Sequence, residues 1–142
     1  MCAYTDRRLK NSGDDRMFQK TPFVPIVLRE EKEQEFLVRW ANYHWFGRHL
    51  FAIPNGGLRD KRTAARLKVQ GVKPGVSDLM LAIPSKGKHG LFIEMKRTKG
   101  GKLSIEQDAF LKDRESHGYE AKVAKGWKEA SEIILGYLGE VL

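Results

Sequence analysis

The chain has 142 residues, of which 41% are hydrophobic, and its formal net charge is +8. This composition excludes a disordered chain and favours one globular domain, while the single cysteine, Cys2, excludes an internal disulfide, and no apolar run reaches the roughly 18 residues of a membrane span. The charge suits a polyanionic partner such as nucleic acid, although an ordinary basic protein fits the charge about as well.

Residues 1–27 are expected to form an N-terminal leader, partly extended or flexible, before a domain at residues 28–142. The leader contains many charges, little periodicity and no apolar signal core, so we expect an intracellular protein. Its apolar end, Thr21–Ile26, contains two prolines that forbid a regular element. We expect this end to lie across the domain as an extended strap.

Residues 28–46 are predicted to form the first helix. Phe36, Trp40 and Tyr43 recur at helical spacing and mark its buried face. The glutamates of its first turn, Glu30, Glu31 and Glu33, suit the positive end of the helix dipole, and most of them need no other explanation.

Residues 50–53 are predicted to form a short strand, and residues 54–57 a turn. A helix over residues 60–70 follows, with Asp60 as its N-cap, Gly71 as its stop and a buried side of Ala64, Ala65, Leu67 and Val69. Arg59, Arg62 and Arg66 share one face of it. Such a face is usually only solvated, but its position before the candidate site favours phosphate binding slightly.

Residues 79–83 and 91–96 are predicted to form a β-hairpin around a polar loop at residues 84–90. Side chains alternate along a strand, so Glu94 and Lys96 share one face, and Asp78 at the head of the partner strand can approach Glu94. On a wet edge strand the Glu94–Lys96 pair would be a solvated ion pair of little value. Together with Asp78 it becomes a candidate site for a divalent metal ion and a hydrolytic water.

A capping box at Ser104–Gln107 predicts a helix to about Ser116, followed by a strand at residues 119–124 and a helix at residues 127–138. The helix between the hairpin and the last strand would let that strand add in parallel. The order of elements indicates an α/β fold, a single domain with a central mixed β-sheet flanked by helices.

Six ordered motifs carry a resemblance to a known family. They are Glu-x-x-x-Gln-x-x-x-x-x-Trp at Glu30, Gln34 and Trp40, Ile-Pro-Asn-Gly-Gly-x-Arg at Ile53–Arg59, Lys-x-Gly-x-x-Asp at Lys73–Asp78, Phe-Ile-Glu-Met-Lys at Phe92–Lys96, Ser-x-x-Gln at Ser104–Gln107, and Gly118-Tyr119. In this order they resemble the virus-type replication and repair nuclease domain, VRR-NUC, in its standalone phage-type form. The resemblance implies the restriction-endonuclease-like core of the PD-(D/E)xK superfamily, over about residue 28 to the C-terminus.

The resemblance also implies the roles of particular residues. Asp78, Glu94 and the Met95 backbone carbonyl would bind Mg²⁺ or Mn²⁺, Lys96 would be the catalytic lysine, and Glu30 would be the acid of the first motif, with Glu31 and Glu33 as alternatives. The candidate residues for contacting the substrate are Asn55, Gly57, Arg59, Arg62, Arg66 and Gln107, of which Arg62 and Arg66 are proposed from the basic helix face rather than from the resemblance. The family usually has proline before the motif aspartate, where this chain has Ser77.

The implied activity is metal-dependent hydrolysis of DNA in the cytoplasm of a prokaryotic or phage-infected cell. Because standalone members resemble Holliday-junction resolvases, branched DNA and a homodimer are implied, with no membrane partner. The alternatives are a non-cleaving DNA-binding module and a nuclease acting on plain duplex or flap DNA. The two carboxylates favour the ammonium form of Lys96, which suits orienting water and stabilising charge better than acting as a base.

Overall fold

The structure is a computed structural model, and it describes residues 26–55 and 60–140. Its elements in chain order are α1 (Glu30–Ala41), the 3₁₀ helix η2 (Gly47–His49), β1 (Leu50–Ala52), α2 (Lys61–Val69), β2 (Leu79–Leu81), β3 (Leu91–Lys96), α3 (Ile105–Ser116), β4 (Glu120–Lys125) and α4 (Trp127–Leu138). Most of the leader lies outside the described residues. Ile26, the one described residue of the expected strap, is 86% exposed, so it does not cover the core.

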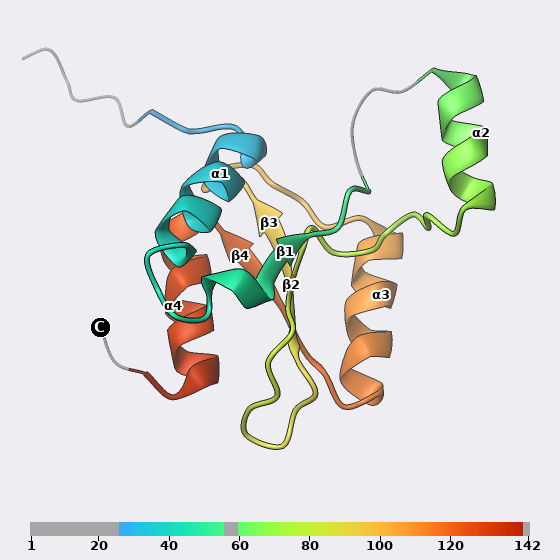
Figure 1. Cartoon of the computed structure of the whole chain (residues 1–142). Coiled ribbons are helices and arrows are strands. Elements are labelled where there is room, and N and C mark those ends of the chain that lie inside the picture. The colour runs from blue at the N-terminus through green and yellow to red at the C-terminus, as the bar shows by residue number, and fades with distance from the viewer. Residues whose placement is uncertain (1–25, 56–59, 141–142) are drawn as a thin grey trace, which may run out of the picture.

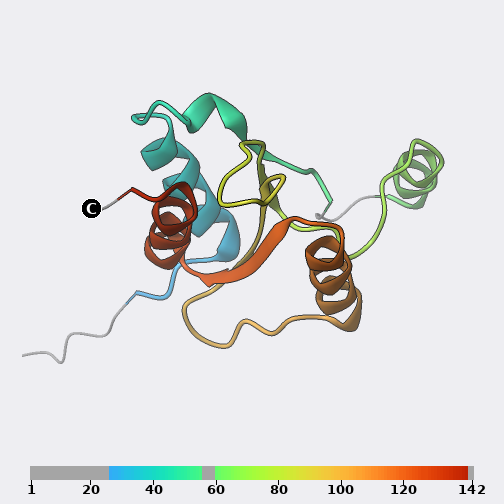
Figure 2. The ribbon, with the colours of Figure 1, turned by 90° about the horizontal axis from the view of Figure 1, so that it is seen from below.

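The four strands form one mixed sheet in the order β1-β2-β3-β4. β1 and β3 pair antiparallel with β2, whereas β4 pairs parallel with β3. Helices α1 and α4 lie on one face of the sheet and α3 lies on the other (Figures 1 and 2). The predicted α/β fold, with a parallel last strand, is therefore confirmed.

The two faces of β3 have different neighbours. Leu91, Ile93 and Met95 are almost fully buried in the core that α1 and α4 cover. Burial of each such side chain contributes about 1.5–3 kcal/mol to folding. On the opposite face, Phe92 packs edge-on against Phe110 of α3, with 5.3 Å between ring centroids. The alternation predicted for this strand thus decides which side chains lie under α3.

The first helix is shorter than predicted, because it ends at Ala41 rather than near Phe46. The chain turns back so closely that a Cβ at Gly47 would lie 2.3 Å from the Ala41 carbonyl oxygen. This reversal buries Phe46 completely and leaves Tyr43, predicted on the buried face, 86% exposed. Burial of Phe46 thus favours a turn over continued helix.

Helix α2 forms as predicted, but its predicted buried side is wrong. Asp60 caps it by accepting a hydrogen bond from the Thr63 backbone N–H, yet none of its residues is buried, and Val69 is 89% exposed. Leu67 and Val69 are two residues apart, so they point to nearly opposite sides of a helix and form no apolar stripe. Figure 1 shows α2 apart from the sheet and its covering helices.

Among the described residues, no helix has the length and apolar character that crossing a membrane requires.

Candidate active site

The candidate site lies where β3 extends beyond its pairing with β2. Leu79 of β2 pairs with Ile93, so the next position along the same register sets Asp78 opposite Glu94, on one face of the sheet. The Asp78 backbone carbonyl accepts a hydrogen bond from Ile53 N–H at 2.8 Å. Its side-chain Oδ2 accepts another from Met95 N–H, also at 2.8 Å. Asp78 is therefore held in place by both neighbouring strands.

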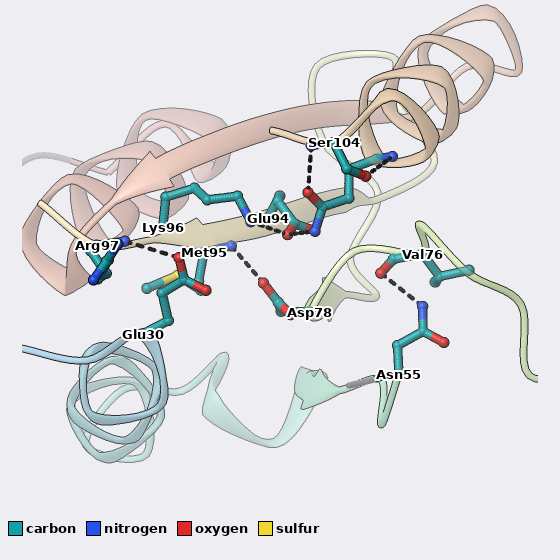
Figure 3. Close-up of polar contacts among 10 residues, drawn as sticks. Glu30, Asn55, Val76, Asp78, Glu94, Met95, Lys96, Arg97 and Ser104 are labelled. Atoms are coloured by element: carbon teal, nitrogen blue, oxygen red, sulfur yellow. Dashed lines mark hydrogen bonds and ion pairs between the residues drawn. The ribbon is translucent and has the colours of Figure 1, made fainter. Parts of the chain in front are cut away.

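The backbone of Met95 contributes a second group at this edge. In an antiparallel ladder the N–H and C=O of one residue face the same side. Since the Met95 N–H points to Asp78, the Met95 carbonyl also faces this side, where β2 no longer pairs with it. Figure 3 shows Asp78, Met95 and Glu94 gathered along this part of β3.

Glu94 is buried beneath α3, with 1% of its surface exposed. Its Oε1 accepts hydrogen bonds from Lys96 Nζ, at 2.7 Å, and from Gln107 Nε2. Its Oε2 is buried and has no hydrogen-bond partner among the described residues. Lys96 is buried as well, so the interpretation of Glu94 and Lys96 as a solvated surface pair is wrong.

Gln107 connects the start of α3 to Glu94. Its side-chain Oε1 accepts a hydrogen bond from the Ser104 backbone N–H at 2.9 Å, and its backbone N–H donates one to Ser104 Oγ at 3.2 Å. These two hydrogen bonds form the predicted capping box. Because Oε1 is used in the cap, the amide must direct Nε2 elsewhere, and it directs it at Glu94. Gln107 therefore orients a carboxylate of the site.

The three glutamates in the first turn of α1 have different neighbours. Glu33 is 4% exposed, and its Oε2 accepts from the Trp127 backbone N–H at 2.9 Å, which caps the start of α4. Glu30 lines a cavity of about 450 Å³ together with Asp78 and Met95. Glu31 lines the same cavity but is exposed. The geometry thus favours Glu30 as the acid of the site and gives Glu33 a structural role.

Burial dominates the electrostatics of the two carboxylates. Burial raises the pKa of Asp78 above its ordinary value, against the hydrogen bond from Met95 and the positive charge of Lys96. Burial, followed by the negative charges of Asp78 and Glu30, raises the pKa of Glu94 to about 7, although Lys96 opposes the change. A bound cation would relieve this unfavourable concentration of negative charge.

The donor set fits a divalent cation that prefers oxygen ligands. It consists of the Asp78 carboxylate, the unpartnered Oε2 of Glu94 and the Met95 carbonyl, with Glu30 beside them. No group of three or more His, Cys, Asp or Glu side chains in residues 26–55 and 60–140 is arranged to hold a metal alone. Mg²⁺ is commonly bound by one or two carboxylates with waters and substrate phosphates, so this smaller set suffices.

Among the remaining predicted residues, Asn55 lines the cavity that contains Asp78. Asn55 donates from Nδ2 to the Val76 carbonyl at 2.9 Å and thereby holds the loop that leads to Asp78. Gly57 and Arg59 lie outside the described residues. Arg62 and Arg66 are exposed on α2 and do not line the cavity that contains Asp78.

Two features of the site have no assigned role in the sequence analysis. Gln34 lines the same cavity as Glu30. It lies four residues after Glu30, so the two share one face of the helix, and this spacing could have indicated its place at the site. Ser77 is fully buried, and its Oγ has no partner among the described residues. No local pattern indicates that burial.

Comparisons with known proteins bear on the family and the fold. The family model of the VRR-NUC domain matches residues 27–128. A solved structure described as a VRR_NUC domain protein superposes with a TM-score of 0.71 and 26% sequence identity, over 80% of this chain and 91% of that chain. A search of curated proteins finds no significant match.

Proposed function

Since the chain belongs to the VRR-NUC family of nucleases, we propose that it is a metal-dependent DNA endonuclease that hydrolyses phosphodiester bonds at Asp78, Glu94 and Lys96. The observation that carries this proposal is the buried Glu94 carboxylate. One of its oxygens is held by Lys96 and Gln107, and the other has no partner among the described residues. A buried polar atom without a hydrogen-bond partner is costly, so an ion or substrate group at this oxygen would explain its retention.

Asp78, Glu94, the Met95 carbonyl and Glu30 would hold Mg²⁺ or Mn²⁺, both of which prefer oxygen ligands. When bound, the metal supplies a more acidic water and polarises the phosphoryl oxygen. Lys96 lies within hydrogen-bond distance of Glu94, which fixes its ammonium group at the site. That ammonium orients the attacking water and stabilises negative charge that develops on the phosphate.

The proposed substrate is branched DNA. A small domain whose described residues include no helix-turn-helix has little surface for reading base sequence, so selection by DNA shape is the simpler choice. Paired nicks across a four-way junction need two sites, which a homodimer would provide. Cutting of plain duplex or flap DNA, and DNA binding without cleavage, are the alternative outcomes.

A labelled four-way junction and a linear duplex of matched arm sequence would test the function. Each is incubated with the wild type in Mg²⁺, Mn²⁺ or EDTA. Paired nicks in the junction alone, absent in EDTA, are the expected result. Equal cutting of both substrates would retain the nuclease but remove the junction selectivity. If the protein binds both substrates without cutting either, the chain acts as a non-cleaving DNA-binding module and the proposal is wrong.

A further inference from the structure

A second cavity, of about 600 Å³, lies between α2 and the loop that precedes Asp78. Its charged lining residues are three exposed lysines, Lys61 and Lys68 of α2 and Lys73 of the loop. No acidic residue lines it, and none of the three lysines forms an ion pair within residues 26–55 and 60–140. We call this cavity the lysine groove.

The groove uses a different face of α2 from the arginines. Lys61, Ala64 and Lys68 are spaced at three and four residues, so they form one stripe along the helix, and all of them line the groove. Arg62 and Arg66 lie more than a quarter turn away from this stripe and do not line it. The apolar lining includes Ala65 and Leu67. The groove therefore combines three lysines with an apolar lining.

The loop wall of the groove is tied to the catalytic residues. Asn55 lines both the lysine groove and the cavity that contains Asp78, and it holds the Val76 carbonyl at 2.9 Å. At Gly75 an added Cβ would lie 2.6 Å from the backbone of Glu106 in α3, so this loop also packs tightly against α3. The lysine groove therefore has one wall fixed relative to the site and opens beside it.

We propose that the lysine groove binds the sugar–phosphate backbone of the DNA strand next to the phosphate that is cleaved. The three lysines contact phosphates as point charges, and the apolar side chains that line the groove accommodate deoxyribose carbon atoms. The groove would thus position the strand across the site. This inference rests on the proposed function, because it takes the nuclease substrate as its ligand.

The first test is the salt dependence of DNA binding, measured by fluorescence anisotropy in EDTA. Lys68→Ala/Lys73→Ala is compared with Lys88→Ala/Lys122→Ala, which removes equal charge from the other end of the sheet, where Lys88 and Lys122 line a separate cavity. Each lost phosphate contact should lower the slope of log affinity against log salt by about 0.9, or roughly 1.8 for the groove variant. The control should keep the wild-type slope. Equal effects of both variants would overturn the proposal.

The second test locates the contact. A series of four-way junctions carries one uncharged methylphosphonate at each position around the cleavage site. Neutralising the phosphate that the groove holds should weaken binding by the wild type and by the Lys88→Ala/Lys122→Ala control, but much less by the Lys68→Ala/Lys73→Ala variant. If the methylphosphonate and the lysine substitutions lower the affinity for DNA additively at every position, the proposal is overturned, even if the variant binds more weakly overall.

A small phosphodiester separates this inference from the proposed function. Bis(4-nitrophenyl) phosphate is too short to reach from the site into the groove, so its Mn²⁺-dependent hydrolysis by the wild type reports on the site alone. Hydrolysis of this compound, with no methylphosphonate position coupled to the lysine substitutions, would reject the role of the groove and retain the nuclease function. Coupling without hydrolysis of this compound or of DNA would support the groove as a DNA-binding surface and remove the nuclease.

Discussion

Glu94 forms a buried ion pair with Lys96. Its charge is buried, and one oxygen lacks a partner among the described residues. Glu94→Gln keeps an oxygen that can accept from Lys96 and Gln107, but it removes the charge. Lys96 then lacks its buried counter-charge, so we expect this variant to unfold at a lower temperature in EDTA, by an amount equivalent to about 3–5 kcal/mol.

Thermal unfolding with and without Mn²⁺ measures this effect. Mn²⁺ should stabilise the wild type and have little effect on Glu94→Gln. The control is Glu35→Gln, which changes an exposed glutamate of α1 and should behave as the wild type does. An unfolding temperature of Glu94→Gln equal to that of the wild type in EDTA would contradict this effect of the ion pair. Equal stabilisation of both proteins by Mn²⁺ would remove Glu94 from the metal site.

Lys96 should act in cleavage rather than in DNA affinity. Because its ammonium group is held at the site by Glu94, Lys96→Ala should lower the cleavage rate by about a hundredfold or more. The dissociation constant for DNA, measured in EDTA, should stay near the wild-type value. Lys99→Ala, in the exposed loop after β3, is the matched control and should cleave normally. Full activity of Lys96→Ala would remove this lysine from the mechanism.

Single residues show where sequence reasoning stops. Alternation along the strand predicts that Glu94 and Lys96 share a face, but it does not predict that α3 covers them. The role of Glu33 depends on Trp127, which is 94 positions away, so no local pattern indicates it. The position of Asp78 near Glu94 was predictable because Asp78 stands at the head of the strand that pairs with the Glu94 strand.

At the scale of elements, the start of α3 serves both the fold and the site. Gln107→Leu removes half of the capping box and the hydrogen bond to Glu94, whereas Ser104→Ala removes the other half of the box and leaves Glu94 untouched. Both should lower the free energy of unfolding by about 1 kcal/mol. Only Gln107→Leu should also lower kcat substantially. An equal loss of kcat in both variants would mean that the cap alone matters.

Helix α2 buries none of its own residues, so its arginines have no packing role to lose. If Arg62 and Arg66 contact DNA phosphates, Arg62→Gln/Arg66→Gln should lower the salt slope of binding by roughly 1.8. The helix should keep its content by circular dichroism, because Gln is a good helix former. An unchanged slope would leave this face simply solvated.

Helices with strong end signals were predictable from the sequence, and the others were not. α3 begins after its capping box, and α4 has glycine at both caps, so their predicted bounds agree with the structure. The end of α1 depends on the burial of Phe46, which is a tertiary contact. The sequence of α2 indicates its helix propensity and its N-cap. It does not indicate whether another element covers the helix, so its exposure could not be predicted.

At the scale of the whole molecule, the order of elements determined the sheet. β1, β2 and β3 are neighbours in the sheet in chain order, although α2 lies in the connection between β1 and β2, and a helix between β3 and β4 favours parallel pairing. The net charge of +8 indicated a polyanionic partner but not where it would bind. The lysine groove was not predictable, because it arises from the relative position of α2 and a loop that precedes β2.

The central claim is that Asp78 and Glu94 hold a metal ion that DNA cleavage requires. Its most direct test is the single-turnover rate of cleavage of a labelled four-way junction in Mn²⁺, with wild type, Asp78→Ala and Glu35→Gln compared at matched folded concentration. The account predicts cleavage by the wild type and by Glu35→Gln, and none by Asp78→Ala at any Mn²⁺ concentration. Cleavage by Asp78→Ala at the wild-type rate would contradict it.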